Sequence, residues 1–566
     1  MKKRSPGRLA VAMTAALALS SGQALAAPSE NATVNLINLL VQQGVLKRDQ
    51  AEALIAQAQA EAQQAVEQRQ AAAQSSPATQ PGDVRVPYVP ETVRDQIRDE
   101  VKQEVIAQAK AENWAAPNTF PDWASRIKVS GDVRSRYESR FYSDTNDNTI
   151  IDFHALNENG PYDVNLNSNN GQLPPLLNTR QDRENRFRIR ARLGVEAQLA
   201  DEWSSGVSVA TGSDDSPVTT TQTLGNNDGK KNIWLDRAWI RWRSPQGYGM
   251  DFGRGANPFM TTDLLWSNDL NLDGLSFSAG DIKLSEPLSL FGTLGAFPLE
   301  YGSDSWPANS WEKGKSEDKW LYGGQVGAEW RIDERNRLKG ALAYYYFDNI
   351  SGVRSAPCSL YEGDPACSSD WSRPKFMQRG NTLFMLRNIV RNPANPASTA
   401  EPQYFGLASE FNLLDVNLVW DTETFNNMKL RLQGNYVRNL AYDEGKMERR
   451  SQGQIADVFL DGEGNIDSGP NAWMLQAMLG RSLEMERQGD WNVFAGYKYI
   501  EPDAMPDAYN DSSFHLGGTN ARGYFLGASY ALADSVALQG RWSSSKEVSG
   551  QPLSIDVFQL DLNARF

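Results

Sequence analysis

The chain has 566 residues, with 56 lysines and arginines against 70 aspartates and glutamates, so its formal net charge is −14 at neutral pH. A nucleic-acid-binding surface needs an excess of basic residues, so this balance argues against nucleic acid as a partner. Mean hydropathy is −0.53, which does not argue against a transmembrane β-barrel, because alternating strands hide their apolar residues in the average.

Residues 1–26 show the three-part pattern of a secretory signal peptide. Basic residues in "MKKRSPGR" precede a mostly apolar run at 9–19, and "ALA" at 24–26 supplies the small residues of a cleavage site. The apolar run is too short for a membrane anchor, which needs about 20 residues. We therefore expect the mature chain to start at Ala27.

Residues 27–121 are predicted to form a periplasmic helical segment. Strong helix formers occupy 27–76, a linker rich in Pro and Ser follows at 77–90, and a further helix with its lead-in covers 91–121. The apolar stripes of these helices are narrow, and a lone helix of this kind buries too little surface to stand alone. Coiled-coil association with other copies and a monomeric helical hairpin both remain open. We expect a homotrimer.

From residue 122 to 566 the hydrophobic period changes to two. In "RFRIRARLGVEAQL" (186–199), apolar residues alternate with arginines and other polar residues, as in a strand with one apolar face. Sixteen such segments are recognisable, the tenth of them "YFGLASEFNL" (404–413). The stretch 413–427 could extend that strand or hold an extra hairpin, which would give eighteen strands.

Short connections such as "ADE" and "IDERN" alternate with long polar ones, for example 139–182 and 348–402. Short turns at one end and long loops at the other are typical of outer-membrane β-barrels. The predicted fold is therefore all-β: an antiparallel up-and-down transmembrane barrel, with its apolar face towards outer-membrane lipid and its polar face towards a wet lumen.

Arginines are concentrated on the polar face of the first predicted strands. Facing lipid, each would cost about 2–4 kcal/mol near the midplane, so we expect them to line the pore. The predicted pore-lining residues are Arg134, Arg136, Arg186, Arg188, Arg190, Arg192, Arg237 and Arg241, with the acids Asp132 and Glu196. This arginine ladder is expected to set up a transverse field, while pairing with lumen acids limits any net ion selectivity.

Few residues suggest catalysis or covalent chemistry. His154 and His515 are the only histidines, both in predicted outer loops, so no Ser-His-Asp set can be assembled and no catalytic residue, metal or cofactor is expected. Cys358 and Cys367 are the only cysteines, and they flank a short segment rich in turn residues. In an exported protein this spacing predicts one disulfide within a loop.

The sequence ends in "FQLDLNARF", an amphipathic strand with Phe566 as its last residue. A terminal aromatic on such a strand resembles the signal recognised by the barrel-assembly machinery of Gram-negative bacteria. From about residue 30 onward the chain resembles the putative porin family of Gram-negative outer membranes, on three stretches: "PETVRDQIRDEVKQEVIAQAKAENWAAPNTFPDWASRIKVSGDVRSRYE", "DFGRGANPF" and "FHLGGTNARGY". The resemblance implies a barrel with an N-terminal periplasmic helical segment. It implies no catalytic residues and no particular substrate.

The sequence therefore predicts an outer-membrane porin, a passive aqueous channel for small polar or charged solutes. An alternative from another class is a structural tether, whose helical arm binds the cell wall or another envelope protein. A barrel enzyme is a third interpretation, because fold alone does not exclude one.

Overall fold

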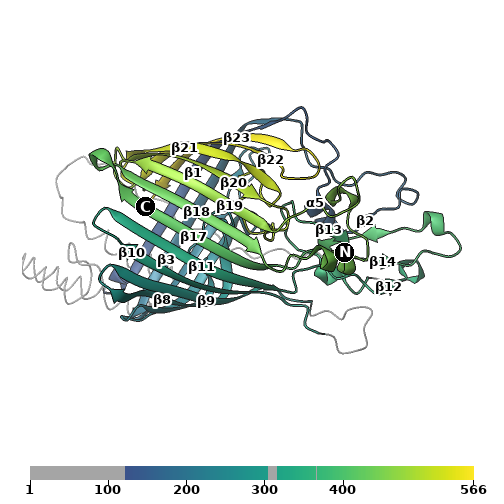
Figure 1. Cartoon of the computed structure of the whole chain (residues 1–566), viewed down its shortest axis with the longest axis horizontal. Coiled ribbons are helices and arrows are strands. Elements are labelled where there is room, and N and C mark those ends of the chain that lie inside the picture. The colour runs from purple at the N-terminus through teal and green to yellow at the C-terminus, as the bar shows by residue number, and fades with distance from the viewer. Residues whose placement is uncertain (1–121, 304–314, 365) are drawn as a thin grey trace, which may run out of the picture. The chain divides into compact units, whose positions relative to one another are not determined.

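The computed structural model describes residues 122–303, 315–364 and 366–566. The signal peptide, helices and linker predicted before residue 122 lie outside these residues. A short helix, α4 (Asp122–Ser125), leads into sixteen long antiparallel strands that close into a barrel (Figure 1). The strands are β1 (Ile127–Tyr142), β3 (Arg183–Ala200), β4 (Trp203–Thr211), β6 (Ile233–Arg243), β7 (Tyr248–Ala256), β8 (Asn271–Ser285), β9 (Leu288–Glu300), β10 (Lys319–Arg331), β11 (Asn336–Asp348), β17 (Asn412–Glu423), β18 (Lys429–Asn439), β19 (Asn471–Gly480), β20 (Trp491–Ile500), β21 (Ala521–Ala533), β22 (Val536–Lys546) and β23 (Ser554–Arg565).

The barrel closes where β1 pairs with both β3 and the final strand, β23. At the end of this seam, the backbone N–H of Gly131 donates to the Phe566 carbonyl at 2.9 Å, and the Phe566 N–H donates back at 3.0 Å. A Cβ on Gly131 would lie 2.5 Å from the Phe566 ring and 2.7 Å from the Arg192 carbonyl oxygen. Because Gly131 has no side chain, the Phe566 ring can lie against the backbone of β1 at the seam.

The connections differ in length at the two ends of the barrel. At the end that holds Phe566 they are short, such as 201–202, 286–287 and 534–535, whereas at the other end they include 143–182 and 349–411. Figure 1 shows the long connections gathered at one end, with the C-terminus at the opposite end. They contain the helices α5 (Phe153–Glu158) and α6 (Glu444–Ser451), the 3₁₀ turns η1 (Leu360–Glu362), η2 (Asp370–Ser372), η3 (Pro396–Ser398) and η5 (Asp457–Phe459), and the short strands β2 (Tyr162–Asp163), β5 (Gln222–Thr223), β12 (Pro357–Cys358), β13 (Leu383–Met385), β14 (Asn388–Ile389), β15 (Pro402–Gln403) and β16 (Phe405–Leu407).

The outer face of the barrel is apolar around its circumference. Exposed large hydrophobic residues on strands around the barrel include Val129 on β1, Phe187 on β3, Leu294 on β9, Leu418 on β17 and Leu526 on β21. In water such a continuous apolar surface would be unfavourable, whereas in lipid it is the expected exterior of a closed barrel. No helix among the described residues is long and apolar enough to cross a membrane.

The strand count is sixteen, and the eighteen-strand alternative is wrong. The stretch 413–427 contains the rest of a single strand, β17, and the tight turn η4 (Phe425–Asn427) that leads into β18. The predicted tenth strand at 404–413 is also misplaced, because Tyr404, Phe405 and Ala408 are buried in loop packing and β17 starts at Asn412. Alternation alone did not separate a short apolar loop strand from the neighbouring wall strand.

The outer half of the lumen holds a hydrophobic core. Inward-facing Tyr345, Phe347 and Leu413 pack with loop residues that include Leu156 and Met505. The simple rule that inward residues are polar therefore fails at this level. The reason is that the long loops fold back over the mouth and supply apolar partners, so these inward positions are dry.

Cys358 and Cys367 form a disulfide within the long connection between β11 and β17. Both cysteines are buried in the part of the molecule formed by the outer loops. The bridge closes a short segment, so its stabilising effect is local.

A charge on the outer face of β23 should prevent insertion, while the same charge on the lumen face should not. Leu560 faces outward near mid-strand, whereas Gln539 on β22 faces the lumen directly opposite Asp561. We expect Leu560→Arg to destabilise the barrel in lipid by about 2–4 kcal/mol. Gln539→Arg is the matched control, expected to fold normally. Refolding into lipid vesicles, followed by the heat-dependent shift in electrophoretic mobility, measures both, and equal folding of the two variants would contradict the assigned faces.

Candidate pore constriction

The connection between β7 and β8, residues 257–270, folds into the lumen, and we call it the crossing loop. Leu264, Leu265 and Trp266 of this loop are almost completely buried. The Met260 N–H donates to Gln325 Oε1 on β10 at 2.7 Å. The Thr262 hydroxyl donates to Asn435 Oδ1 on β18 at 2.6 Å. These contacts fix the loop against strands far from its own ends.

The far end of the crossing loop is held by ion pairs with the opposite wall. Asp263 lies 2.9 Å from the Lys498 ammonium on β20 and 4.0 Å from the Arg541 guanidinium on β22. The same two cations lie 3.6 and 3.7 Å from Asp511 in the β20–β21 loop. Since the crossing loop leaves from β7 and returns to β8, these contacts carry it across the barrel.

Aromatic packing fills one side of the lumen beside the crossing loop. The Tyr345 ring centroid lies 5.3 Å from that of Trp266 and 5.1 Å from that of Phe259, both in edge-to-face geometry. Phe297 and Phe347 extend the cluster on β9 and β11. Aromatic rings thus fill this side around Tyr345 and Trp266, and a polar cavity remains on the side of β1 and β3.

The arginine ladder lies on that polar side. In the β1–β3 register, Arg134 lies opposite Arg190, Arg136 opposite Arg188, and Asp132 opposite Arg192. All face the lumen, because the intervening residues Val133 and Leu193 are on the exposed apolar face. The alternating pattern of two strands therefore brings guanidinium groups together in rows across the sheet.

Glu138 is the main counter-charge of the outer part of the ladder. Its carboxylate has no solvent exposure and lies 3.0 Å from Arg140, 3.0 Å from Arg188 and 3.6 Å from Arg186. Gln559 also donates to it at 3.1 Å. Such a buried carboxylate is tolerated because several charged donors surround it.

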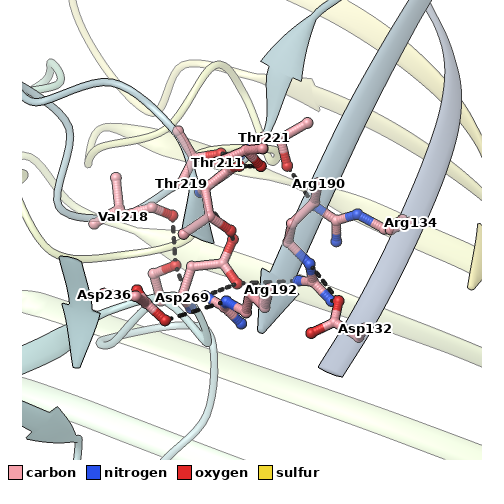
Figure 2. A network of polar contacts seen from close by, with 12 residues as sticks. Asp132, Arg134, Arg190, Arg192, Thr211, Val218, Thr219, Thr221, Asp236 and Asp269 are labelled. Atoms are coloured by element: carbon pink, nitrogen blue, oxygen red, sulfur yellow. Dashed lines mark hydrogen bonds and ion pairs between the residues drawn. The ribbon is translucent and has the colours of Figure 1, made fainter. Parts of the chain in front are cut away.

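Asp269 of the crossing loop is the counter-charge of the inner part. It lies 3.1 Å from both Arg190 and Arg192, and Arg190 also contacts Asp132 at 2.7 Å. Figure 2 shows Arg190 between Asp269 and Asp132, and Arg192 directed towards Asp236 and Asp269. Burial alone would raise the pKa of Asp269, but the two arginines lower its pKa below the usual value, so it stays charged.

A cavity of about 560 Å³ lies between the ladder and the far wall of the lumen. Arg134, Arg136, Arg188 and Arg190 line one side of it. Acids of the crossing loop and the β20–β21 loop, together with Asp561 on β23, line other parts. A solute in this space would meet fixed charges of both signs, which is the arrangement that produces a strong local field.

Some predicted pore-lining residues lie apart from this cavity. Arg237 pairs with Asp236 at 4.0 Å, and Arg241 pairs with Asp251 at 2.7 Å while lying 4.1 Å from the Trp239 ring centroid. Glu196 is on the lumen side of β3, opposite Lys128 in the register, and forms no ion pair with the described residues. Four of the eight predicted arginines, Arg134, Arg136, Arg188 and Arg190, line the cavity. Arg186, Arg192 and Asp132 do not line it and join the same network through ion pairs with Glu138, Asp269 and Arg190.

Several residues of the charge network were not predicted from the sequence. Glu138 lies on the same face of β1 as Asp132 and Arg134, so extending the alternating pattern of the first predicted strand to residue 138 would have identified it. Asp263 and Asp269 lie in an aperiodic stretch with no strand pattern, and only its apolar residues "LLW" hinted at burial. Lys498 and Asp511 gave no signal, because their partners are distant in the sequence.

The β20–β21 loop, residues 501–520, is packed among the other outer loops. His515 lies in this outer loop, as expected, and it is fully buried there, with Nδ1 at 3.0 Å from the Ser545 hydroxyl. Burial raises the pKa of Asp503 to about 6 and that of Asp507 to about 7. His154, Glu158 and Asp215 bring potential metal-ligand atoms within 4.8 Å of one another at the surface, but two of the three are exposed acids, and we assign no metal to them.

A closed barrel of sixteen strands with an apolar exterior, a charged lumen and a loop across that lumen has the architecture of a porin-type barrel. The sequence profile of the putative porin family matches residues 30–566, and the chain belongs to that family.

Three solved structures similar to the chain are distant from it. They are the outer membrane channel DcaP of Acinetobacter baumannii (10% identity, TM-score 0.36, covering 78% of this chain and 97% of that chain), OprB of Pseudomonas putida (10%, 0.41, 78% and 95%) and OmpF of Salmonella typhi (9%, 0.39, 78% and 97%). No function is transferred from similarities this distant. A search among curated proteins found no match.

The crossing loop should loosen when its buried cation is removed. Lys498→Met would leave Asp263 and Asp511 with Arg541 alone, at 4.0 and 3.7 Å, at a cost of about 3 kcal/mol. We expect frequent closures and current noise in single-channel recordings. Lys339→Met is the control, because Lys339 also faces the lumen but contacts no residue of the crossing loop through its charge: its ammonium lies 3.9 Å from Glu329 and 4.8 Å from the Phe291 ring centroid. Quiet recordings from folded Lys498→Met protein would contradict an anchoring role.

Proposed function

We propose that this protein is an outer-membrane porin, a passive aqueous channel for small polar or charged solutes. The observation that carries the proposal is the charged cavity of about 560 Å³ beside the crossing loop, inside a barrel with an apolar exterior. Fixed charges and hydroxyls in such a lumen replace part of the hydration of a passing solute. Membership of the putative porin family agrees with this function.

The constriction can orient solutes as well as limit their size. Guanidinium groups of β1 and β3, which outnumber their acids, lie on one side of the cavity, and the balanced ion pairs of Asp263 and Asp511 with Lys498 and Arg541 lie on another side. A field between the two sides aligns dipolar solutes and favours those that replace ordered water with hydrogen bonds. Apolar solutes cannot form such hydrogen bonds with this lining.

Purified protein in planar lipid bilayers tests the proposal directly. We expect stable conductance steps that are ohmic at low voltage, and we expect vesicles containing the protein to swell in solutions of small sugars. A barrel that is correctly folded by its heat-dependent mobility but silent in bilayers would contradict the channel. Such a result would favour the tether, in which the arm formed by residues 27–121 binds the cell wall or an envelope protein.

The proposal includes the partners expected from the sequence. These are outer-membrane lipid around the apolar face, the barrel-assembly machinery, and two further copies of the chain in a homotrimer, with residues 27–121 in the periplasm. The exposed apolar exterior of the wall supports a lipid-facing or copy-facing surface.

Phe566 is proposed to act in assembly, and its side chain should affect yield more than stability. The Phe566 side chain is 68% exposed, whereas its backbone closes the seam with Gly131. Phe566→Ser keeps those backbone hydrogen bonds and removes the ring. We expect a large loss of outer-membrane protein in cells but near-normal refolding into lipid in vitro. Normal cellular yield would show that the ring is only part of the lipid-facing surface.

A further inference from the structure

We infer that the constriction contains a binding subsite for one small oxyanion, such as a carboxylate group, at the guanidinium of Arg134. This inference deepens the proposed channel function, on which it rests, by naming the solute class that the constriction favours. The evidence is the charge pairing around Arg134, which differs from that of the other arginines in the ladder.

Arg134 lies between two neighbours that cannot neutralise it. On β3 the residue directly opposite is Arg190, and on β23 the residue directly opposite is Asn563. Two residues further along β1, Arg136 lies opposite Asp561 of β23 and binds its two carboxylate oxygens at 2.6 and 2.7 Å. The register thus supplies a carboxylate to Arg136 and a neutral amide to Arg134.

Every other arginine of the ladder forms an ion pair with at least one carboxylate. Six arginines of the ladder and the neighbouring Arg140 form ion pairs with five acids, Arg241 pairs separately with Asp251, and Arg134 makes no ion pair with any described residue. The seven are Arg136, Arg140, Arg186, Arg188, Arg190, Arg192 and Arg237, and the five are Asp132, Glu138, Asp236, Asp269 and Asp561. These arginines outnumber their acids, and Arg134 is the member of the set that has no carboxylate within ion-pair distance among the described residues.

The other charged contact of the constriction is balanced. On the far wall, Lys498 and Arg541 face Asp263 and Asp511, two cations with two anions. The unpaired Arg134 therefore lies on the β1–β3 side of the cavity, whose lining also includes Arg565 and Glu484. Like charges directly opposite each other on neighbouring strands are destabilising. Asp132 and Asp269 offset the charge of Arg190 at 2.7 and 3.1 Å, whereas no carboxylate of the described residues lies within ion-pair distance of Arg134.

The surroundings of Arg134 suit an oxyanion. Its Nη2 donates to the Thr221 hydroxyl, and its Nε has no hydrogen-bond partner among the described residues. Thr221, Arg190 and Asn563 line the same cavity of about 560 Å³, and Figure 2 shows Arg134 and Arg190 next to each other with Thr221 near them. A guanidinium group binds the planar carboxylate through paired N–H donors. The cavity has room for the rest of a small organic acid.

The test compares three variants with the wild-type full-length protein in planar bilayers. Arg134→Gln removes the charge, and Asn563→Asp leaves Arg134 in place but gives it a carboxylate on the neighbouring strand. Arg431→Gln is the control: Arg431 is also in the lumen, but it is paired with Asp421 at 2.6 Å, and Asp421 keeps Arg337 at 2.8 Å when Arg431 is removed. The reversal potential in a potassium chloride gradient gives the ratio of chloride to potassium permeability.

We expect an anion-selective wild type, a fall in the permeability ratio of about twofold or more in both Arg134→Gln and Asn563→Asp, and little change in Arg431→Gln. Replacing chloride by acetate should reveal a conductance that saturates with concentration in the wild type. In Arg134→Gln the half-saturating acetate concentration should rise about tenfold. A cation-selective wild type, an unchanged ratio in Arg134→Gln, or an equal shift in Arg431→Gln would overturn the subsite.

Failure of the channel and failure of the subsite can be told apart. Saturation-transfer NMR with acetate measures contact with the folded barrel in detergent without any need for conduction. A silent bilayer with acetate contact that is lost in both Arg134→Gln and Asn563→Asp would contradict the channel but support the subsite. A conducting wild type whose acetate signal is the same in all variants would contradict the subsite alone.

Discussion

Closure of the backbone hydrogen-bond network is the constraint on which the rest of this structure depends. Hydrocarbon offers no water to an unpaired N–H or carbonyl group, so a sheet within it must have no free edge. The seam between β1 and β23 removes that edge, and the Gly131–Phe566 hydrogen bonds complete it at the end of the strand. An even number of strands then follows, because the first and last strands must run antiparallel to each other.

Closure also determines where charge can lie. Each strand has one face towards lipid, so the guanidinium groups of β1 and β3 must share the inner face, where their register brings arginine opposite arginine. The cost of this arrangement is reduced by acids from several sources: Glu138 from the same strand, Asp561 from β23 and Asp269 from the crossing loop. The crossing loop is therefore an electrostatic partner of the ladder as well as an obstruction in the lumen.

The crossing loop packs against aromatic residues on one side of the lumen and leaves a charged cavity on the other side. Trp266 and Phe259 pack on Tyr345, and the outer loops extend this apolar core towards the mouth. Any passage for solutes is consequently displaced towards β1, β3, β22 and β23, where the charged cavity lies. Hydrophobic packing on one wall thus leaves the charged cavity beside the other wall as the space that a solute would have to use in the proposed channel.

Much of this organisation was predictable from local pattern. The alternation in "RFRIRARLGVEAQL" identified a wall strand, its lipid face and its lumen face, and the arginines on one side had to face inward because lipid would exclude them. The spacing of Cys358 and Cys367 predicted a pair that the structure joins. Local pattern failed at 404–413, because loop residues packed in a hydrophobic core have the same apolar spacing as a wall strand.

The sequence by itself determined the barrel class, the faces of the strands and the arginine ladder, because strand periodicity and the cost of charge in lipid act on neighbouring residues. Only the tertiary structure decided which charges meet. Asp269 reaches Arg190 and Lys498 reaches Asp263 because a loop crosses the lumen, and Arg134 lacks a carboxylate because closure places Asn563 beside it. Such pairings depend on register and loop path, which join residues hundreds of positions apart and leave no periodic trace in the chain.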